Sequence, residues 1–188
     1  MKIIFLDIDG VLNTADTVVK VDSAVDIDLF RVEYLKRIVD KTDAKIVLTS
    51  SNKVHFKKEN GRVVPVTDTN CYGHSFINIL MNYGLELYDV IPTIRNSLGR
   101  EASRQEEIKV WLSLNNNVDG FVILDDETTG LMDFIGLNFI ILNNLPIGET
   151  LCNMDNCVGL GEEHIELAVN ILNNRTRNKV YKKTKGSN

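Results

Sequence analysis

Residues 2–13 read Lys-Ile-Ile-Phe-Leu-Asp-Ile-Asp-Gly-Val-Leu-Asn, and this stretch decides the fold. Four apolar residues follow the lysine without polar alternation, which is typical of a strand buried on both faces. Asp7 and Asp9 come directly after this run, and Gly10 allows the chain to turn sharply there. Packing gives no reason for acids at the end of a buried strand. The stretch therefore predicts a strand and a functional site at its end.

Three further apolar runs predict buried strands: Lys45–Leu48, Gly120–Leu124 and Asn138–Leu142. Between and after the runs, apolar side chains repeat at three and four residues, which predicts helices around residues 29–39, around residues 106–114 and over Glu162–Leu172. Strands that alternate with helices indicate an α/β protein. We expect a doubly wound parallel sheet with helices on both faces.

The length of 188 residues fits one domain, which we expect over residues 1–174. Residues 52–103 separate two strands by more than a crossover needs, so we expect a small insertion over the site. Within it, Glu59-Asn60-Gly61-Arg62 predicts a hairpin turn and Phe76–Tyr83 a helix. Residues 175–188 are basic and poor in apolar side chains, and we expect a solvated tail there.

Composition sets the class of protein. Hydrophobic residues make up 44% and charged residues 25%, and the net charge of −5 argues against a general nucleic-acid binder. The apolar runs fall far short of the roughly 20 residues that span a bilayer, and Asp7 and Asp9 interrupt the N-terminal run. We expect a cytoplasmic protein without a membrane partner. Cys71, Cys152 and Cys157 form no Cys-x-x-Cys pair, so neither a disulfide framework nor a zinc site is predicted.

Polar residues also follow two of the other predicted strands. Thr49-Ser50-Ser51-Asn52 follows the second strand, and Asp125-Asp126-Glu127 follows the third. In a parallel sheet these ends meet the acids of the first strand in one crevice. Several carboxylates so close would repel each other unless a cation lay among them. Oxygen ligands without clustered His or Cys favour Mg²⁺.

This combination of residues suits transfer of a phosphoryl group. One carboxylate can attack a metal-bound phosphate, and the second, two residues further on, can shuttle a proton. The backbone N–H groups beside Gly10 can cradle the anion. The alternatives are purely structural roles: Asp7 and Asp9 only form a turn, and Thr49 and Ser50 only cap a helix.

At this point the residues resemble a family, the haloacid dehalogenase-like phosphatases. Their signature D-x-D-G-[VT]-L matches residues 7–12 completely. The second motif of that family, an apolar strand ending in Ser or Thr, resembles residues 46–50, and the acidic fourth motif resembles residues 122–126. With the helix over 106–114 and the closing segment 159–163, the chain looks most like the small phosphatase-type domains of bacterial and viral RNA-repair proteins.

The resemblance implies roles for individual residues. Asp7 would be the nucleophile that forms an aspartyl-phosphate, and Asp9 the acid that protonates the leaving oxygen and later the base that activates water. Thr49, helped by Ser50, would bind the transferring phosphoryl group. Gly10 and Asn13 are further candidates for substrate binding.

The resemblance also implies a metal and a cation. Mg²⁺ would be held by Asp7, the backbone carbonyl of Asp9 and Asp126. Asp125 would not bind the ion directly but would orient the residues that do. The basic residue of the third motif is predicted to be Arg104, with Arg100 as the competitor and Lys109 less favoured. A solvated Arg104 on a helix surface is the alternative.

We therefore predict a Mg²⁺-dependent phosphomonoesterase. No long insertion follows Asn13, so the crevice is expected to be open to a bulky substrate such as a nucleic-acid end, and a nucleotide is the other candidate. Two alternatives are a silent phosphate-binding or regulatory module and a repair component that needs a partner protein. His55, His74 and His164 are interpreted as surface residues, and Tyr72 as a conjectural substrate contact.

Overall fold

The structure is a computed structural model that describes residues 1–17, 25–95, 97–150 and 153–174. The predicted tail and Cys152 lie outside the described residues. Along the chain the elements are β1 (Lys2–Leu6), α1 (Leu29–Thr42), β2 (Lys45–Leu48), the 3₁₀ helix η1 (Ser51–His55), β3 (Phe56–Glu59), β4 (Arg62–Pro65), α2 (Cys71–Asn82), β5 (Leu87–Val90), α3 (Arg104–Leu114), β6 (Gly120–Asp125), η2 (Met132–Phe134), β7 (Phe139–Ile141), η3 (Met154–Asn156) and α4 (Glu162–Asn173).

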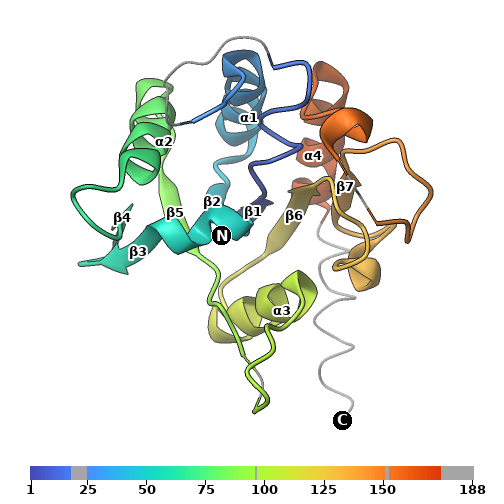
Figure 1. The fold of residues 1–188 in the computed structure, drawn as a ribbon. Coiled ribbons are helices and arrows are strands. Elements are labelled where there is room, and N and C mark those ends of the chain that lie inside the picture. Colours follow the sequence, from blue (N-terminus) through green and yellow to red (C-terminus); the bar gives the residue numbers. More distant parts are fainter. Residues whose placement is uncertain (18–24, 96, 151–152, 175–188) are drawn as a thin grey trace.

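The main sheet has five parallel strands in the order β5-β2-β1-β6-β7 (Figure 1). This confirms the predicted doubly wound sheet, because the chain moves outward from β1 first through β2 and β5 and then through β6 and β7. The order reverses beside β1, where such folds open a crevice at the carboxyl ends of their strands. Leu6 at the end of β1 pairs with Leu48 of β2 and Leu124 of β6, so these three strands end level with one another.

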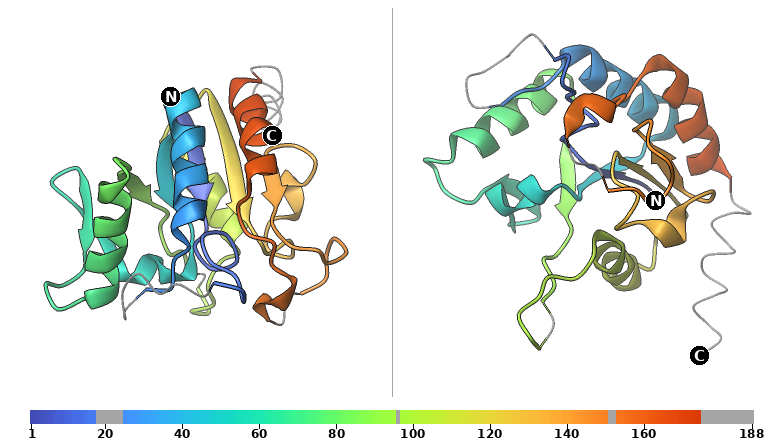
Figure 2. Two further views of the ribbon diagram at one scale, coloured as in Figure 1. Left: turned by 90° about the horizontal axis from the view of Figure 1, so that it is seen from above. Right: turned by 45° about the vertical axis from the view of Figure 1, so that its right-hand side comes forward.

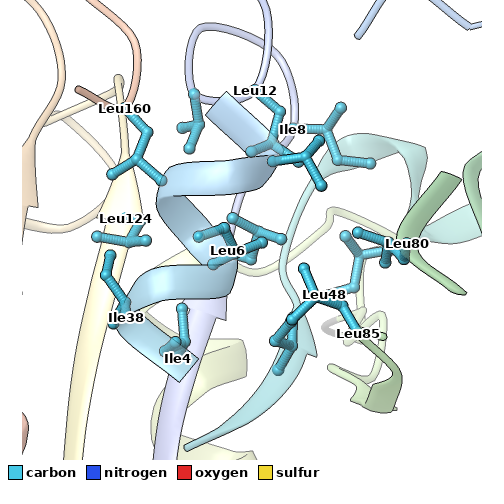
Figure 3. Close-up of a cluster of buried hydrophobic side chains, with 14 of the residues drawn as sticks. Ile4, Leu6, Ile8, Leu12, Ile38, Leu48, Leu80, Leu85, Leu124 and Leu160 are labelled. Carbon is cyan, nitrogen blue, oxygen red and sulfur yellow. The ribbon is translucent and has the colours of Figure 1, made fainter. Parts of the chain in front are cut away.

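Both faces of the sheet are buried, which explains why the strands lack polar alternation. Ile4 and Leu6 belong to the core under α1, α2 and α4. Figure 3 shows both among other side chains of this core, including Ile38 of α1. Ile3 and Phe5 belong to the core on the opposite face, under α3. Figure 1 shows α1, α2 and α4 on one side of the sheet and α3 on the other. The predicted helices on both faces are therefore confirmed.

Helix α3 begins two residues before the predicted segment, and a local cap explains its start. The side chain of Ser103 accepts a hydrogen bond from the backbone N–H of Glu106, and Glu106 accepts one from the backbone N–H of Ser103. This capping box satisfies two backbone donors that would otherwise lack partners. Further along, Trp111 packs edge-on against Phe5 with 5.4 Å between ring centroids. The first residue of the helix, Arg104, is thereby held over the end of the sheet.

The segment 52–103 contains the predicted hairpin, β3 and β4. Asn60 and Gly61 both have positive φ, 51° and 80°, as the type I′ turn requires. Helix α2 begins at Cys71, five residues before the predicted start, because the side chain of Asn70 accepts a hydrogen bond from the N–H of Gly73. The hairpin and α2 lie together at one side of the sheet (Figure 2).

The same segment also contains β5, a strand of the main sheet that the sequence analysis did not predict. It is four residues long, lies at the sheet edge and carries Asp89 in its middle, so its pattern does not stand out. The Asp89 carboxylate accepts hydrogen bonds from Trp111 Nε1 at 3.1 Å and pairs with Lys58 Nζ at 3.0 Å. This acid therefore connects the edge strand to α3 and to the hairpin.

In the described residues, no helix combines the length and the apolar character that crossing a membrane requires.

Helix α4 begins with a cap that depends on a neutral histidine. Nδ1 of His164 accepts a hydrogen bond from the backbone N–H of Gly161 at 2.9 Å. Burial lowers the pKa of His164, and nearby Arg31 lowers it further, while Glu163 acts in the opposite direction. A protonated Nδ1 can no longer accept this hydrogen bond.

We predict that this cap is lost on acidification. A histidine whose pKa is lowered on folding stabilises the protein above its unfolded pKa of about 6.5, and the stabilisation is lost as the pH falls through the folded pKa. Relative to His164→Gln, whose side chain accepts without titrating, the wild type should lose up to about 1 kcal/mol of unfolding free energy between pH 7 and pH 5. Urea unfolding of both proteins across this range measures the difference, and parallel pH curves would contradict the cap.

Candidate active site

The site lies where β1 and β6 end. The backbone N–H of Asp7 continues the ladder by donating to the carbonyl of Leu124 at 3.0 Å. Its carboxylate is buried, with Oδ1 accepting from the N–H of Ile8 at 2.8 Å and Oδ2 from Nη1 of Arg104 at 2.7 Å. Asp7 is thus fixed by its neighbours from two sides.

Two more carboxylates lie beside Asp7. Asp125 is the last residue of β6 and Asp126 follows it, and both are buried. One carboxylate oxygen from each of Asp7, Asp125 and Asp126 lies within 4.8 Å of the others. The predicted convergence of acids from two strand ends is therefore present.

Arg104 is the cation that approaches these acids. Its Nη1 forms ion pairs with Oδ2 of Asp7 and with Oδ2 of Asp125, and its side chain is 19% exposed. Burial would lower the pKa of Arg104, but the charges of Asp125 and Asp7 outweigh this effect and raise it. The guanidinium therefore keeps its charge inside the site, where it offsets part of the repulsion among the carboxylates.

The acids themselves are harder to ionise than usual. Burial raises the pKa of Asp125 to about 8, with Asp7 adding to the rise and Arg104 opposing it. Burial also raises the pKa of Asp126 to about 6, and the charge of Asp7 contributes. A divalent cation nearby would favour the charged form of both carboxylates.

Gly10 forms part of the same cradle. It has a φ of 71°, and a Cβ built on it would lie 2.1 Å from Oδ2 of Asp126. A side chain at this position would displace that carboxylate. The glycine of the first motif therefore serves two purposes: it allows the turn after β1 and leaves room for an acid that follows β6.

These residues fit Mg²⁺. The donors are hard carboxylate oxygens, which this ion prefers. Both oxygens of Asp125 have partners already, because Oδ2 pairs with Arg104 and Oδ1 accepts from the N–H of Glu127 at 3.0 Å. Both oxygens of Asp7 also have partners, and Oδ2 of Asp126 accepts from Cys157. The assignment of Asp7 and Asp126 as ligands, with Asp125 behind them, therefore stays a prediction.

Asp9, in contrast, has an exposed side chain at the mouth of the site. Two amides hold it: Nδ2 of Asn13 donates to Oδ1 at 2.9 Å, and Nδ2 of Asn52 donates to Oδ2 at 2.8 Å. Asn13 also accepts from the N–H of Gly10 at 2.9 Å and donates to the carbonyl of Asp26. The structure thus gives Asn13 a role inside the turn, and its contact with substrate stays a prediction.

The predicted hydroxyls lie at the end of β2. The N–H of Thr49 donates to the carbonyl of Leu6 at 2.8 Å, but its buried Oγ1 has no hydrogen-bond partner in the described part of the chain. A buried hydroxyl without a partner is costly, and an incoming phosphoryl oxygen would satisfy it. Ser50, also buried, caps η1 by accepting from the N–H of Asn52 at 3.3 Å. The capping alternative therefore holds for Ser50.

The other basic candidates lie elsewhere. Arg100 is exposed in the loop before α3, and Lys109 pairs with Asp133. Arg104 is the candidate that the structure brings to Asp7, while its catalytic role stays a prediction. His55 is half-buried and contacts Tyr72, which differs from the interpretation of His55 as an ordinary surface residue.

The sequence analysis missed a buried ion pair near the site. Lys53 of η1 pairs with Glu107 of α3, and these side chains are 12% and 4% exposed. Both line a pocket of about 410 Å³ together with Thr49 and Arg104. A lysine five residues after a strand carries no pattern of its own, so only the packing of η1 against α3 identifies it.

Two hydrogen bonds that hold Asp126 in place were also not predicted from the sequence. Sγ of Cys157 donates to Oδ2 of Asp126 at 3.1 Å, and Nδ2 of Asn143 donates to its backbone carbonyl. Burial raises the pKa of Cys157 to about 12, and the hydrogen bond to Asp126 adds to the rise. Cys157 is thus a neutral thiol that orients a carboxylate. The bridge between Asn143 and Cys157 brings these supports together.

A doubly wound sheet with paired acids after its first strand, a hydroxyl after the second and two acids after β6 defines a haloacid dehalogenase-like domain. A family model described as "HAD domain in Swiss Army Knife RNA repair proteins" matches residues 3–144, and the chain belongs to this family. No curated protein and no solved structure matches the chain.

We predict that Gly10→Ala abolishes stabilisation by Mg²⁺. Mg²⁺ at about 100 times its dissociation constant should stabilise the wild type by about 2.7 kcal/mol, seen as a higher melting temperature. In the variant, the displaced Asp126 carboxylate should leave this increase near zero. The matched control is Gly61→Ala, which also has positive φ but meets nothing within 4 Å and should keep the increase. An equal effect of Mg²⁺ on both variants would contradict the cradle.

Proposed function

We propose that this chain is a Mg²⁺-dependent phosphomonoesterase that acts through an aspartyl-phosphate on Asp7. The observation that carries the proposal is the geometry around Asp7: Arg104 pairs with its carboxylate, and Asp126 lies beside it. The unpartnered hydroxyl of Thr49, at the end of the neighbouring strand, completes a place for a phosphoryl group. Membership of a haloacid dehalogenase-like family supports this class of activity.

In the first step a carboxylate oxygen of Asp7 attacks the phosphorus atom. A bond forms between that oxygen and phosphorus, and the ester bond to the leaving alcohol breaks. Asp9 donates a proton to the leaving oxygen. The amides of Asn13 and Asn52 hold the Asp9 carboxyl group in place for this transfer.

In the second step Asp9 accepts a proton from water, and the water oxygen attacks phosphorus. The bond to Asp7 breaks, which releases inorganic phosphate and restores both acids. Arg104 and Thr49 bind phosphoryl oxygens in both steps. Mg²⁺ held by Asp7, Asp126 and the backbone carbonyl of Asp9 would offset the charge of the phosphoryl oxygens and favour the approach of the anionic nucleophile.

We propose that the substrate is a phosphomonoester at a nucleic-acid end or on a nucleotide. The family description names RNA repair proteins, which supports a nucleic-acid end. The net charge of −5 gives no general attraction for a polyanion, so recognition would be confined to the site and its rim.

The proposed nucleophile can be tested by replacing Asp7. Asp7→Asn keeps the size of the side chain but removes the attacking oxygen anion, so it should reduce phosphate release by at least about 10³-fold. Phosphate release from p-nitrophenyl phosphate, mononucleotides and 5′- or 3′-phosphorylated oligonucleotides with Mg²⁺ measures the loss, and melting temperature checks that the variant is folded. Substantial activity in the folded variant would rule out the covalent route.

The proposed role of the Arg104 guanidinium can be tested in the same assay. Arg104→Ala leaves Asp7 and Asp125 without their shared partner and should reduce kcat/KM by about 10²-fold or more. Arg100→Ala is the matched control, because it removes the same charge from the loop just before α3. A larger effect at Arg100 than at Arg104 would transfer the role of the third motif to Arg100.

The same assays separate the alternatives. Phosphate binding without release by the wild type would favour a silent binding module. Release that appears only when a partner protein is added would favour a repair component that depends on it.

A further inference from the structure

A row of packed rings runs from the buried core to the half-buried His55 of η1. Phe76 lies in the core of the sheet face covered by α2, and Tyr72 lies one turn earlier on the same helix, with its ring stacked at 15° to that of Phe76. The ring of His55 lies next on Tyr72, with 4.8 Å between centroids and 34° between planes. Phe56 packs edge-on against both Tyr72 and Phe76. The phenylalanines are buried, whereas Tyr72 and His55 are half-buried.

The outermost ring of this row is held in place. Nδ2 of Asn70 lies 3.2 Å from Nδ1 of His55 and also donates to the backbone carbonyl of His55 at 3.1 Å. An amide NH₂ only donates, so Nδ1 accepts and Nε2 carries the proton of the neutral imidazole. Asn70 caps α2 as well, which links the orientation of the histidine ring to the start of the helix that carries Tyr72.

The row lies beside the proton donor of the proposed reaction. Asn52, which binds Oδ2 of Asp9, and His55 belong to the same 3₁₀ helix, η1. Side chains three residues apart in a 3₁₀ helix eclipse each other and are separated by about 6 Å along its axis. His55 is thus on the same face of η1 as Asn52.

We propose that His55, backed by Tyr72, is a stacking platform for the nucleobase of the leaving group. The inference rests on the proposed function and names its substrate class: phosphomonoesters of nucleosides, free or at the end of a polynucleotide. Aromatic and imidazole rings bind unstacked bases in this way.

The order of the groups matches that of a nucleoside. The leaving oxygen must lie at Asp9, because Asp9 protonates it. With the leaving oxygen at Asp9, the sugar would lie beside Asn52. The base would then lie on the ring of His55, three residues further along η1. A base on His55 continues a row of rings whose inner members are already packed, so little further ordering is needed to bind it.

The experiment compares substrates that differ only in the base. A nucleoside 5′-monophosphate and ribose 5-phosphate are tested for turnover by the wild type, and for binding to the Asp7→Asn protein by calorimetry with Mg²⁺. Stacking should favour the nucleotide about fivefold to a hundredfold in kcat/KM and in affinity. His55→Ala should bring both ratios close to one, whereas His55→Phe keeps a ring and should retain most of the preference.

The matched control is His74→Ala, an exposed histidine on α2 near Tyr72, which should leave both ratios unchanged. Equal binding of the nucleotide and ribose 5-phosphate would overturn the platform. Turnover of both sugar phosphates at the same rate would do so as well, while leaving the phosphatase intact. Absence of turnover together with base-dependent binding would instead overturn the phosphatase and keep the platform.

A final comparison distinguishes the two sources of the base. An oligonucleotide with a terminal phosphate is compared with the same oligonucleotide whose last residue is abasic. Preference for the oligonucleotide over the free nucleotide, lost in the abasic form, assigns the platform to nucleic-acid ends. The opposite preference assigns it to mononucleotides, and indifference to the base in both pairs contradicts the platform.

Discussion

The structure depends on the burial of three carboxylates at the ends of two parallel strands. Asp7, Asp125 and Asp126 are buried and would repel one another when charged, and Arg104 offsets only part of that repulsion. Burial is the main cause of the raised pKa values of Asp125 and Asp126, and the charge of Asp7 adds to it. A cation bound among these acids would relieve the repulsion, which is why the proposed function includes Mg²⁺.

Much of the surrounding architecture keeps these acids in position. The capping box at Ser103 sets where α3 begins, and the packing of Trp111 on Phe5 fixes the helix over the sheet, so that Arg104 reaches both strand ends. On the other flank, Cys157 and Asn143 hold Asp126, and Gly10 leaves room for it. Stability of the fold and geometry of the site therefore rest on shared contacts.

The strands β1, β2, β6 and β7 and the helices were predictable because burial on both faces leaves a continuous apolar run, and helices repeat at three and four residues. The paired acids and the hydroxyls were predictable because polar residues at buried strand ends have no packing role. Strand β5 was not, since an edge strand of four residues with Asp89 in it has no such pattern. Lys53 and Cys157 were missed because their importance comes from partners more than thirty residues away.

The fold class, the family motifs and the acids of the site could be predicted from the sequence, because short local stretches carry them. Which basic residue approaches Asp7 depended on the tertiary structure, since Arg100 lies in the loop before α3 and Arg104, four positions later, begins the helix. The contact between the rings of His55 and Tyr72 likewise depended on it, because the packing of η1 and α2 brings together rings that are seventeen positions apart. Contacts of this kind depend on how elements pack, which no local pattern encodes.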